Sequence, residues 1–261
     1  MLSEPSSEPA SEPASEPAPE PASQPASQSV SEQGRPPQAV RDDLWLFAPN
    51  RDSSGGSAWW LEQPGPDGSR GLLIDCPALT LANLQFLQER GPGWIVLMGR
   101  EGHGRTRRLQ EALGWPVLVQ EQEAYLMPGV QGLQPFGAEL ALAPGLRILW
   151  TPGPTPGASV LLAQGGALGE MAVLFCGRLL SPVAEGQAAP LRHRRSFHWG
   201  RWLRSLERLR GWLPPPGPDT PPLWLASGAG LGALRGEALI PHGWDLLQRL
   251  DLEALALQQP A

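Results

Sequence analysis

The stretch "WTPGPTPGASVLL" (150–162) decides the fold, together with "AVLFCGRLLSP" (172–182), which follows it in the chain. In the first stretch a turn rich in glycine and proline precedes an apolar run of strand length, and in the second an apolar run precedes a turn. Glycine and proline specify such turns because glycine permits, and proline fixes, backbone angles that other residues adopt less readily. The turns are therefore as closely specified as the strands. Pro154 stands in the first turn and Arg178 in the second.

The first forty residues differ from the rest in composition. They repeat Ser-Glu-Pro-Ala with almost no branched or aromatic side chains, and their six glutamates and single arginine give −6 + 1 = −5 of the chain's net charge of −6. Such a segment cannot bury enough apolar surface to offset the entropy of ordering it. We therefore predict a disordered tail with polyproline II character over residues 1–40 and one domain over residues 41–261.

The composition of the remaining chain excludes several classes of protein. Its net charge is close to −1, which argues against a dedicated nucleic-acid binder. No apolar run approaches the ~18 residues of a membrane span, and no signal-peptide pattern opens the chain, so we expect no membrane association and a cytoplasmic location. Cys76 and Cys176 cannot form a disulfide framework and suit a reducing compartment.

Short apolar runs separated by turns predict strands, and amphipathic stretches predict helices between them. The predicted strands cover residues 44–49, 57–63, 71–77, 94–98, 115–120, 146–150, 158–164, 171–176 and 223–227. The predicted helices cover 80–91 and 105–113, a long segment that begins near Phe197, and the C-terminal region. Strands that alternate with helices in this way indicate a layered α/β fold.

Five stretches resemble, in order and spacing, the metallo-β-lactamase-like superfamily over essentially residues 43–235. They are "LLIDCP" (72–77), "WIVLM" (94–98), "TPGPTPGASVLL" (151–162), "VLFCGRLL" (173–180) and "LWLASGAG" (223–230). The resemblance implies a four-layer αββα sandwich with two mixed sheets. It also implies a metal site at the edge where the two sheets meet.

Proteins of that family bind their metals through a His-x-His-x-Asp-His run, a His in Thr-Pro-Gly-His, an Asp in Phe-Thr-Gly-Asp and a late His. The corresponding seven ligand positions in this chain are Gly99, Glu101, His103, Gly104, Pro154, Arg178 and Ala229. Only Glu101 and His103 could coordinate a metal, whereas a zinc site needs three or four protein ligands. Arg178 also brings a permanent cation. We therefore expect a retained scaffold with a degenerate metal site and no cofactor.

Charged residues near these positions suggest an anion site instead. Arg100 lies within the glycine-rich loop "GREGHG" (99–104) and Arg105 follows it, and a loop of this kind before a helix can bind anions through backbone N–H groups. With Arg178 they are the candidate anion ligands, and the alternative is a solvated helix face. We further expect Arg178 to pair with Glu101 or Asp75 in the pocket, or else to point into solvent.

Residues 197–212 predict an amphipathic helix whose Trp and Leu side chains pack on a sheet. The run Arg192–Arg195 precedes it on a loop, where it could contact an acidic partner or nucleic-acid phosphates, or could be solvated. His198 and His242 stand in tryptophan-rich contexts, so we expect packed or hydrogen-bonded histidines there.

Three functions remain open. The first is a non-catalytic protein of this fold that binds a small anionic ligand or a protein partner. The second is a divergent ester or thioester hydrolase that uses Glu101 and His103, either with one weakly held zinc or iron ion or by a metal-free acid–base route. The third is an assembly protein that uses the Trp/Arg helix over residues 197–212.

Overall fold

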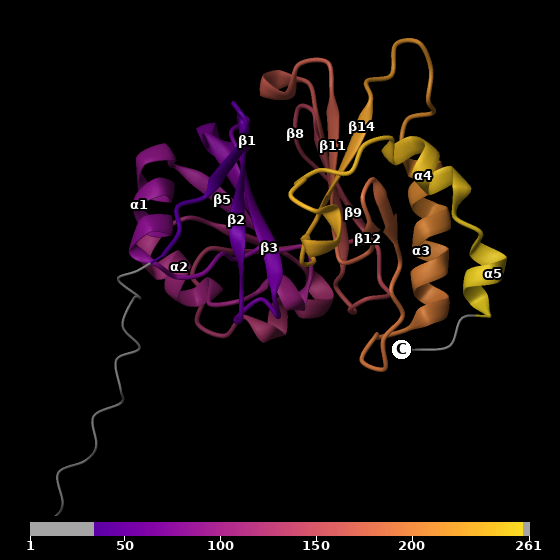
Figure 1. Cartoon of the computed structure of the whole chain (residues 1–261). Coiled ribbons are helices and arrows are strands. Elements are labelled where there is room, and N and C mark those ends of the chain that lie inside the picture. The colour runs from indigo at the N-terminus through magenta and orange to yellow at the C-terminus, as the bar shows by residue number, and fades with distance from the viewer. Residues whose placement is uncertain (1–33, 258–261) are drawn as a thin grey trace, which may run out of the picture.

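The computed structural model describes residues 34–257, which form four layers (Figure 1). Two β-sheets face each other in the centre, with α1 and α2 outside the first sheet and α3, α4 and α5 outside the second. This arrangement confirms the predicted αββα sandwich with two mixed sheets. It arises because each sheet has apolar residues on both faces and must be covered on both.

The first sheet has seven strands that lie in chain order. They are β1 (Gln38–Arg41), β2 (Leu44–Asn50), β3 (Gly56–Leu61), β4 (Gly71–Ile74), β5 (Gly93–Val96), β6 (Val117–Gln120) and β7 (Leu133–Phe136). The pairs from β1 to β4 are antiparallel, and those from β4 to β7 are parallel. The parallel half requires crossovers, and α1 and α2 supply two of them.

The second sheet has five strands in the order β14-β11-β10-β9-β8. Their bounds are β8 (Glu139–Ala143), β9 (Leu146–Trp150), β10 (Ser159–Gln164), β11 (Ala172–Gly177) and β14 (Leu223–Ser227). Only the β11–β14 pair is parallel. A separate hairpin is formed by β12 (Ser181–Ala184) and β13 (Gln187–Ala189).

Five α-helices lie on the outer faces of the sheets. They are α1 (Leu81–Arg90), α2 (Thr106–Leu113), α3 (Trp199–Trp212), α4 (Gly243–Arg249) and α5 (Leu252–Ala256), and short 3-10 turns include η2 (Arg100–Gly102) and η3 (Glu121–Leu126). The Thr80 side chain caps α1 by accepting from the Asn83 amide. His198 caps α3 in the same way, since its Nδ1 accepts from the Arg201 amide at 3.2 Å. The prediction of a hydrogen-bonded His198 is confirmed.

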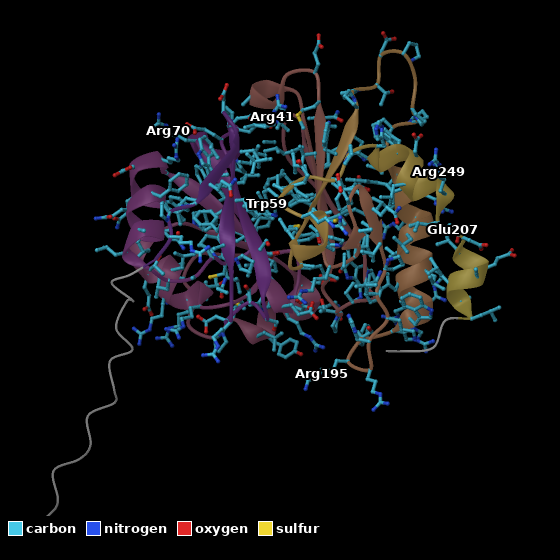
Figure 2. The ribbon with its side chains drawn as sticks, in the orientation of Figure 1. Arg41, Trp59, Arg70, Arg195, Glu207 and Arg249 are labelled. Carbon is cyan, nitrogen blue, oxygen red and sulfur yellow. The ribbon has the colours of Figure 1, made fainter. Side chains whose placement is uncertain are left out.

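Three apolar clusters fill the spaces between the four layers. Trp59 projects from β3 between the two sheets (Figure 2) and meets Phe175 of β11 edge-on, with 6.1 Å between ring centroids. Behind the first sheet, Trp60 packs against Trp115, and behind the second sheet Trp202 of α3 is buried. The predicted Trp/Leu face of α3 is therefore part of the core.

The boundary predicted between tail and domain is a few residues too late. Residues 38–41 form β1, which pairs with β2, and Val40 packs against the core between the sheets. The mixed sequence around this strand hides it, since β1 is defined by its pairing and not by an apolar run. The disorder predicted for residues 1–33 falls outside the described residues.

Several strands were not predicted, namely β7, β8, β12 and β13. Each is five residues or shorter, and β7 contains Pro135 at an edge of its sheet. Proline is tolerated in edge strands because their outer N–H groups need no ladder partner. The strand character of these segments therefore comes from a neighbouring strand and not from their own pattern.

Both cysteines are buried free thiols, as expected. Burial raises the pKa of Cys76 and of Cys176 to about 12, so neither thiol ionises near neutral pH. In the described part of the chain, no helix combines the length and apolar character that a bilayer span requires.

Candidate functional site

The site forms where strand ends from both sheets converge. Asp75 follows β4, Met98 and Gly99 follow β5, and Arg178 follows β11. These residues line a small cavity of about 10 Å³, which is roughly the space of one water molecule, together with Glu101, Gly102, Pro154, Thr155, Ala158, Gly177 and Gly228. Chain segments far apart in sequence therefore share one polar enclosure.

Asp75 is the most buried acid at this cavity, with 4% of its surface exposed. Its Oδ1 accepts a hydrogen bond from the Met98 amide at 2.8 Å, and its backbone is left-handed, with φ 59°. Aspartate tolerates this region better than most residues. Burial raises the pKa of Asp75 to about 7, against the opposing effects of the Met98 N–H and the Arg178 cation. Asp75 is thus a buried acid that titrates near neutrality.

The chain approaches Asp75 closely at two glycines. A Cβ atom on Gly102 would lie 2.1 Å from Asp75 Oδ1, and one on Gly228 would lie 2.9 Å from Oδ2. The first distance is well inside van der Waals contact, and the carboxylate is held by its bond to Met98 and cannot easily move. Glycine is therefore required at position 102 for a steric reason.

The Gly102→Ala variant is expected to lose about 1 to 3 kcal/mol of unfolding free energy, the usual cost of overpacking a buried site. Gly137→Ala is the matched control, because a Cβ there meets nothing within 4 Å. Urea denaturation followed by circular dichroism measures both. Equal stability of the two variants would contradict the close packing of Gly102 on Asp75.

The titration of Asp75 predicts a pH-dependent stability. Its pKa is about 7 in the folded chain against a usual 3.8, so the folded state binds more protons between these values, and stability falls as pH rises through that window. Asp75→Asn retains an acceptor for Met98 but does not titrate. The unfolding free energy of the wild type minus that of the variant should decrease from pH 4 to 7 and then level off. Urea denaturation across this range checks the prediction, and a constant difference would contradict it.

Glu123 of η3 is a site residue that the sequence did not reveal. It is 1% exposed, its Oε1 accepts from the Gly157 amide at 2.8 Å, and its Oε2 lies 3.5 Å from His103 Nε2. Burial would raise the pKa of Glu123, but His103, the Thr155 hydroxyl and the Gly157 amide together outweigh it and lower the pKa. Glu123 thereby ties the "TPGPTPG" turn of the second sheet to the loop that follows β5.

Arg178 does not form the predicted ion pair. No ion pair in the described chain joins it to Glu101 or Asp75, and its Nη2 instead donates to the carbonyls of Ser53 and Ser54 at 3.0 and 2.9 Å. The side chain is half-buried, so the solvent alternative is also incomplete. Backbone carbonyls attract the guanidinium because they bring several acceptors without a second charge to desolvate. Burial raises the pKa of Asp75 and of Glu101, and the charge of Arg178 partly opposes this rise.

A larger cavity of about 540 Å³ opens beside the small one. Glu101, Pro154 and Arg178 line both. The remaining wall residues are Ser54, Arg100, Ser181, Leu191, His193, Arg194, Arg195, Ser196 and Trp202. Figure 2 shows Arg195 at the end of the molecule from which the loop before α3 projects. The cavity is therefore basic, with a single carboxylate in its wall.

Of the three candidate anion ligands, the structure brings Arg100 and Arg178 to this cavity but not Arg105. Arg105 Nε pairs with Asp52 Oδ2 at 2.9 Å and lines neither cavity. Arg194 and Arg195 were not chosen as anion ligands. The signal available in the sequence was the basic run before α3. Which way these side chains point depends on the path of the loop that carries them. This loop passes the turn at Pro154, where the Phe197 amide donates a hydrogen bond to the Pro154 carbonyl.

Comparison with solved structures bears on the fold. The solved structure of VMB-1 matches with a TM-score of 0.58 at 14% identity, covering 85% of this chain and 95% of its own. An archaeal metallo-β-lactamase superfamily protein from Sulfolobus tokodaii gives 0.53 at 13%, covering 87% and 88%. A Staphylococcus aureus metallo-β-lactamase gives 0.54 at 16%, covering 86% and 69%. This chain has the metallo-β-lactamase fold. No protein-family model and no curated protein matches the sequence.

The residues at the seven ligand positions do not fit the metal centre that the metallo-β-lactamase fold implies. Four of them, Gly99, Glu101, Pro154 and Arg178, line the small cavity, but only Glu101 carries a donor atom with a free electron pair. Among residues 34–257, no group of three or more His, Cys, Asp or Glu side chains is placed to hold a metal ion.

The other three ligand positions do not line either cavity. His103 is buried and directs Nε2 at Glu123, and Gly104 lies against Cys76. Ala229 follows Gly228, and its carbonyl accepts from the Ser57 hydroxyl at 3.1 Å. The two residues that could coordinate, Glu101 and His103, are therefore not presented to the same space.

Proposed function

We propose that this protein is a non-catalytic member of the metallo-β-lactamase fold that binds a small anionic ligand in the 540 Å³ cavity. The observation that carries the proposal is the wall of that cavity. Arg100, Arg178, Arg194 and Arg195 line it against the single carboxylate of Glu101. The planar guanidinium group of arginine can donate two parallel hydrogen bonds to a carboxylate or a phosphate. Such a wall therefore favours these anions.

Three of the four arginines of the wall are available to a ligand. The guanidinium groups of Arg100, Arg194 and Arg195 make no ion pair or hydrogen bond within the described residues, whereas Arg90 and Arg147 elsewhere are paired with glutamates. Residues 34–257 carry 20 arginines and 26 − 6 = 20 acids, so their net charge is zero. The positive charge is therefore local to the cavity, and this suits a small ligand better than an extended nucleic acid.

The other two functions receive less support. A metal-free acid–base route would need His103 at the substrate, but His103 lies against Glu123 outside both cavities. An assembly role for the Trp/Arg helix over residues 197–212 could use its exposed arginines but not its Trp/Leu face, because Trp202, Leu206 and Leu209 are buried in the core. The two free thiols are the ground on which we place the protein in the cytoplasm.

Isothermal titration of the full chain with inorganic phosphate tests the proposal. The Arg194→Gln/Arg195→Gln variant should bind phosphate at least about tenfold more weakly, because each charge-assisted hydrogen bond contributes roughly 1.5 to 3 kcal/mol. Arg107→Gln/Arg108→Gln is the matched control, since these arginines lie on α2 and pair with Glu111. Absence of phosphate binding, or equal losses in both variants, would contradict the proposal.

A further inference from the structure

We propose that the ligand of the basic cavity is a hydroxylated organic anion whose hydroxyl enters the small cavity and donates a hydrogen bond to a carboxyl oxygen of Glu101 or Asp75 there, while its acid group binds the arginines. This inference rests on the proposed function and names the class of ligand. It follows from two adjacent cavities that share Glu101, Pro154 and Arg178, one with a wall rich in arginine and the other with two carboxyl groups in its wall.

The small cavity is built to receive a hydrogen-bond donor. Asp75 lines it with 96% of its surface buried, and although Oδ1 is bonded to Met98, no described residue donates to Oδ2. Glu101 is half-buried in the same wall, and its carboxylate has no hydrogen bond or ion pair within the described chain. Burial raises the pKa of Glu101, against Arg178 and Arg100, as expected for a carboxyl short of donors. Two carboxyl groups, each with an oxygen that receives no hydrogen bond from the described residues, therefore face one enclosed space.

The size of the small cavity selects the donor. At about 10 Å³ it accommodates one water molecule or a group of that size, such as a hydroxyl. An acid group is excluded because it is larger and would face two carboxyl groups. An ammonium is disfavoured because, unlike a hydroxyl, it would have to shed its hydration in this small space, and the Arg178 guanidinium in the same wall would repel it.

Glu101 then acts as a specificity residue. An anion without a donor meets the arginines but is repelled by Glu101, whereas an anion with a suitably placed hydroxyl converts this repulsion into a hydrogen bond. A site that hydrogen-bonds a ligand hydroxyl rejects the analogue that lacks it, because the buried acceptor would be left unpaired. Glu101 in the basic wall is therefore a means of discrimination between anions.

The test compares three phosphate monoesters by isothermal titration with the full chain. Glycerol 1-phosphate should bind at least about tenfold more tightly than methyl phosphate, which lacks the hydroxyls, and more tightly than phosphoethanolamine, which carries an ammonium. In Glu101→Leu the preference for glycerol phosphate should disappear while methyl phosphate binds as well or better, because the repulsion is removed. Glu101→Gln keeps an acceptor and should retain part of the preference.

Methyl phosphate binding by Glu101→Leu also shows that the variant is folded. Equal affinity for glycerol and methyl phosphates in the wild type, or a preference that survives in Glu101→Leu, would overturn the inference while leaving the proposed function standing. Tightest binding of phosphoethanolamine would overturn the assignment of a hydroxyl. Failure of every phosphate to bind would overturn the proposed function and this inference with it.

Discussion

The buried carboxylate of Asp75 is the constraint on which the site depends. Asp75 directly follows β4, and its carboxylate accepts a hydrogen bond from the Met98 amide just after β5. The same carboxylate leaves no room for a side chain at Gly102. Gly228, after β14 of the second sheet, approaches its other oxygen. A single side chain therefore lies in close contact with segments that follow strands of both sheets, at the edge where the cavities lie. Because burial disfavours the charged form, the pKa of Asp75 is raised to about 7.

The turns around Asp75 belong to a chain with the metallo-β-lactamase fold, and the side chains at the ligand positions that the resemblance implies offer few donor atoms for a metal. The "TPGPTPG" turn is held by Glu123 through the Gly157 amide, and a Cβ at Gly157 would lie 2.7 Å from Glu123 Cγ. Arg178 is fixed by backbone carbonyls of residues 53 and 54 and places a permanent cation in the wall of the small cavity. The positive charge in this wall thus comes from the Arg178 side chain. Under the proposed function, this positive charge attracts an anion without the Lewis acidity that a metal contributes.

The sequence predicted the central strands because they are buried on both faces and read as continuous apolar runs, as residues 94–98 do. Edge strands such as β7 and β8 escaped prediction because pairing, and not their own pattern, makes them strands. Glu101, Pro154 and Arg178, which the resemblance aligned with ligand positions, line one cavity in the structure. It could not find Glu123, which is 34 residues from Gly157 in the chain. Local patterns carry no information about such tertiary contacts.

The most direct test of the central claim, that an anion site has replaced the metal centre, is the metal content of the purified full-length chain. The protein is exposed to zinc and to iron, dialysed, and analysed by elemental analysis against protein concentration. We expect well under one metal ion per chain, because no three His, Cys, Asp or Glu side chains of residues 34–257 are placed to coordinate the same ion. A stoichiometric metal that survives dialysis would contradict it.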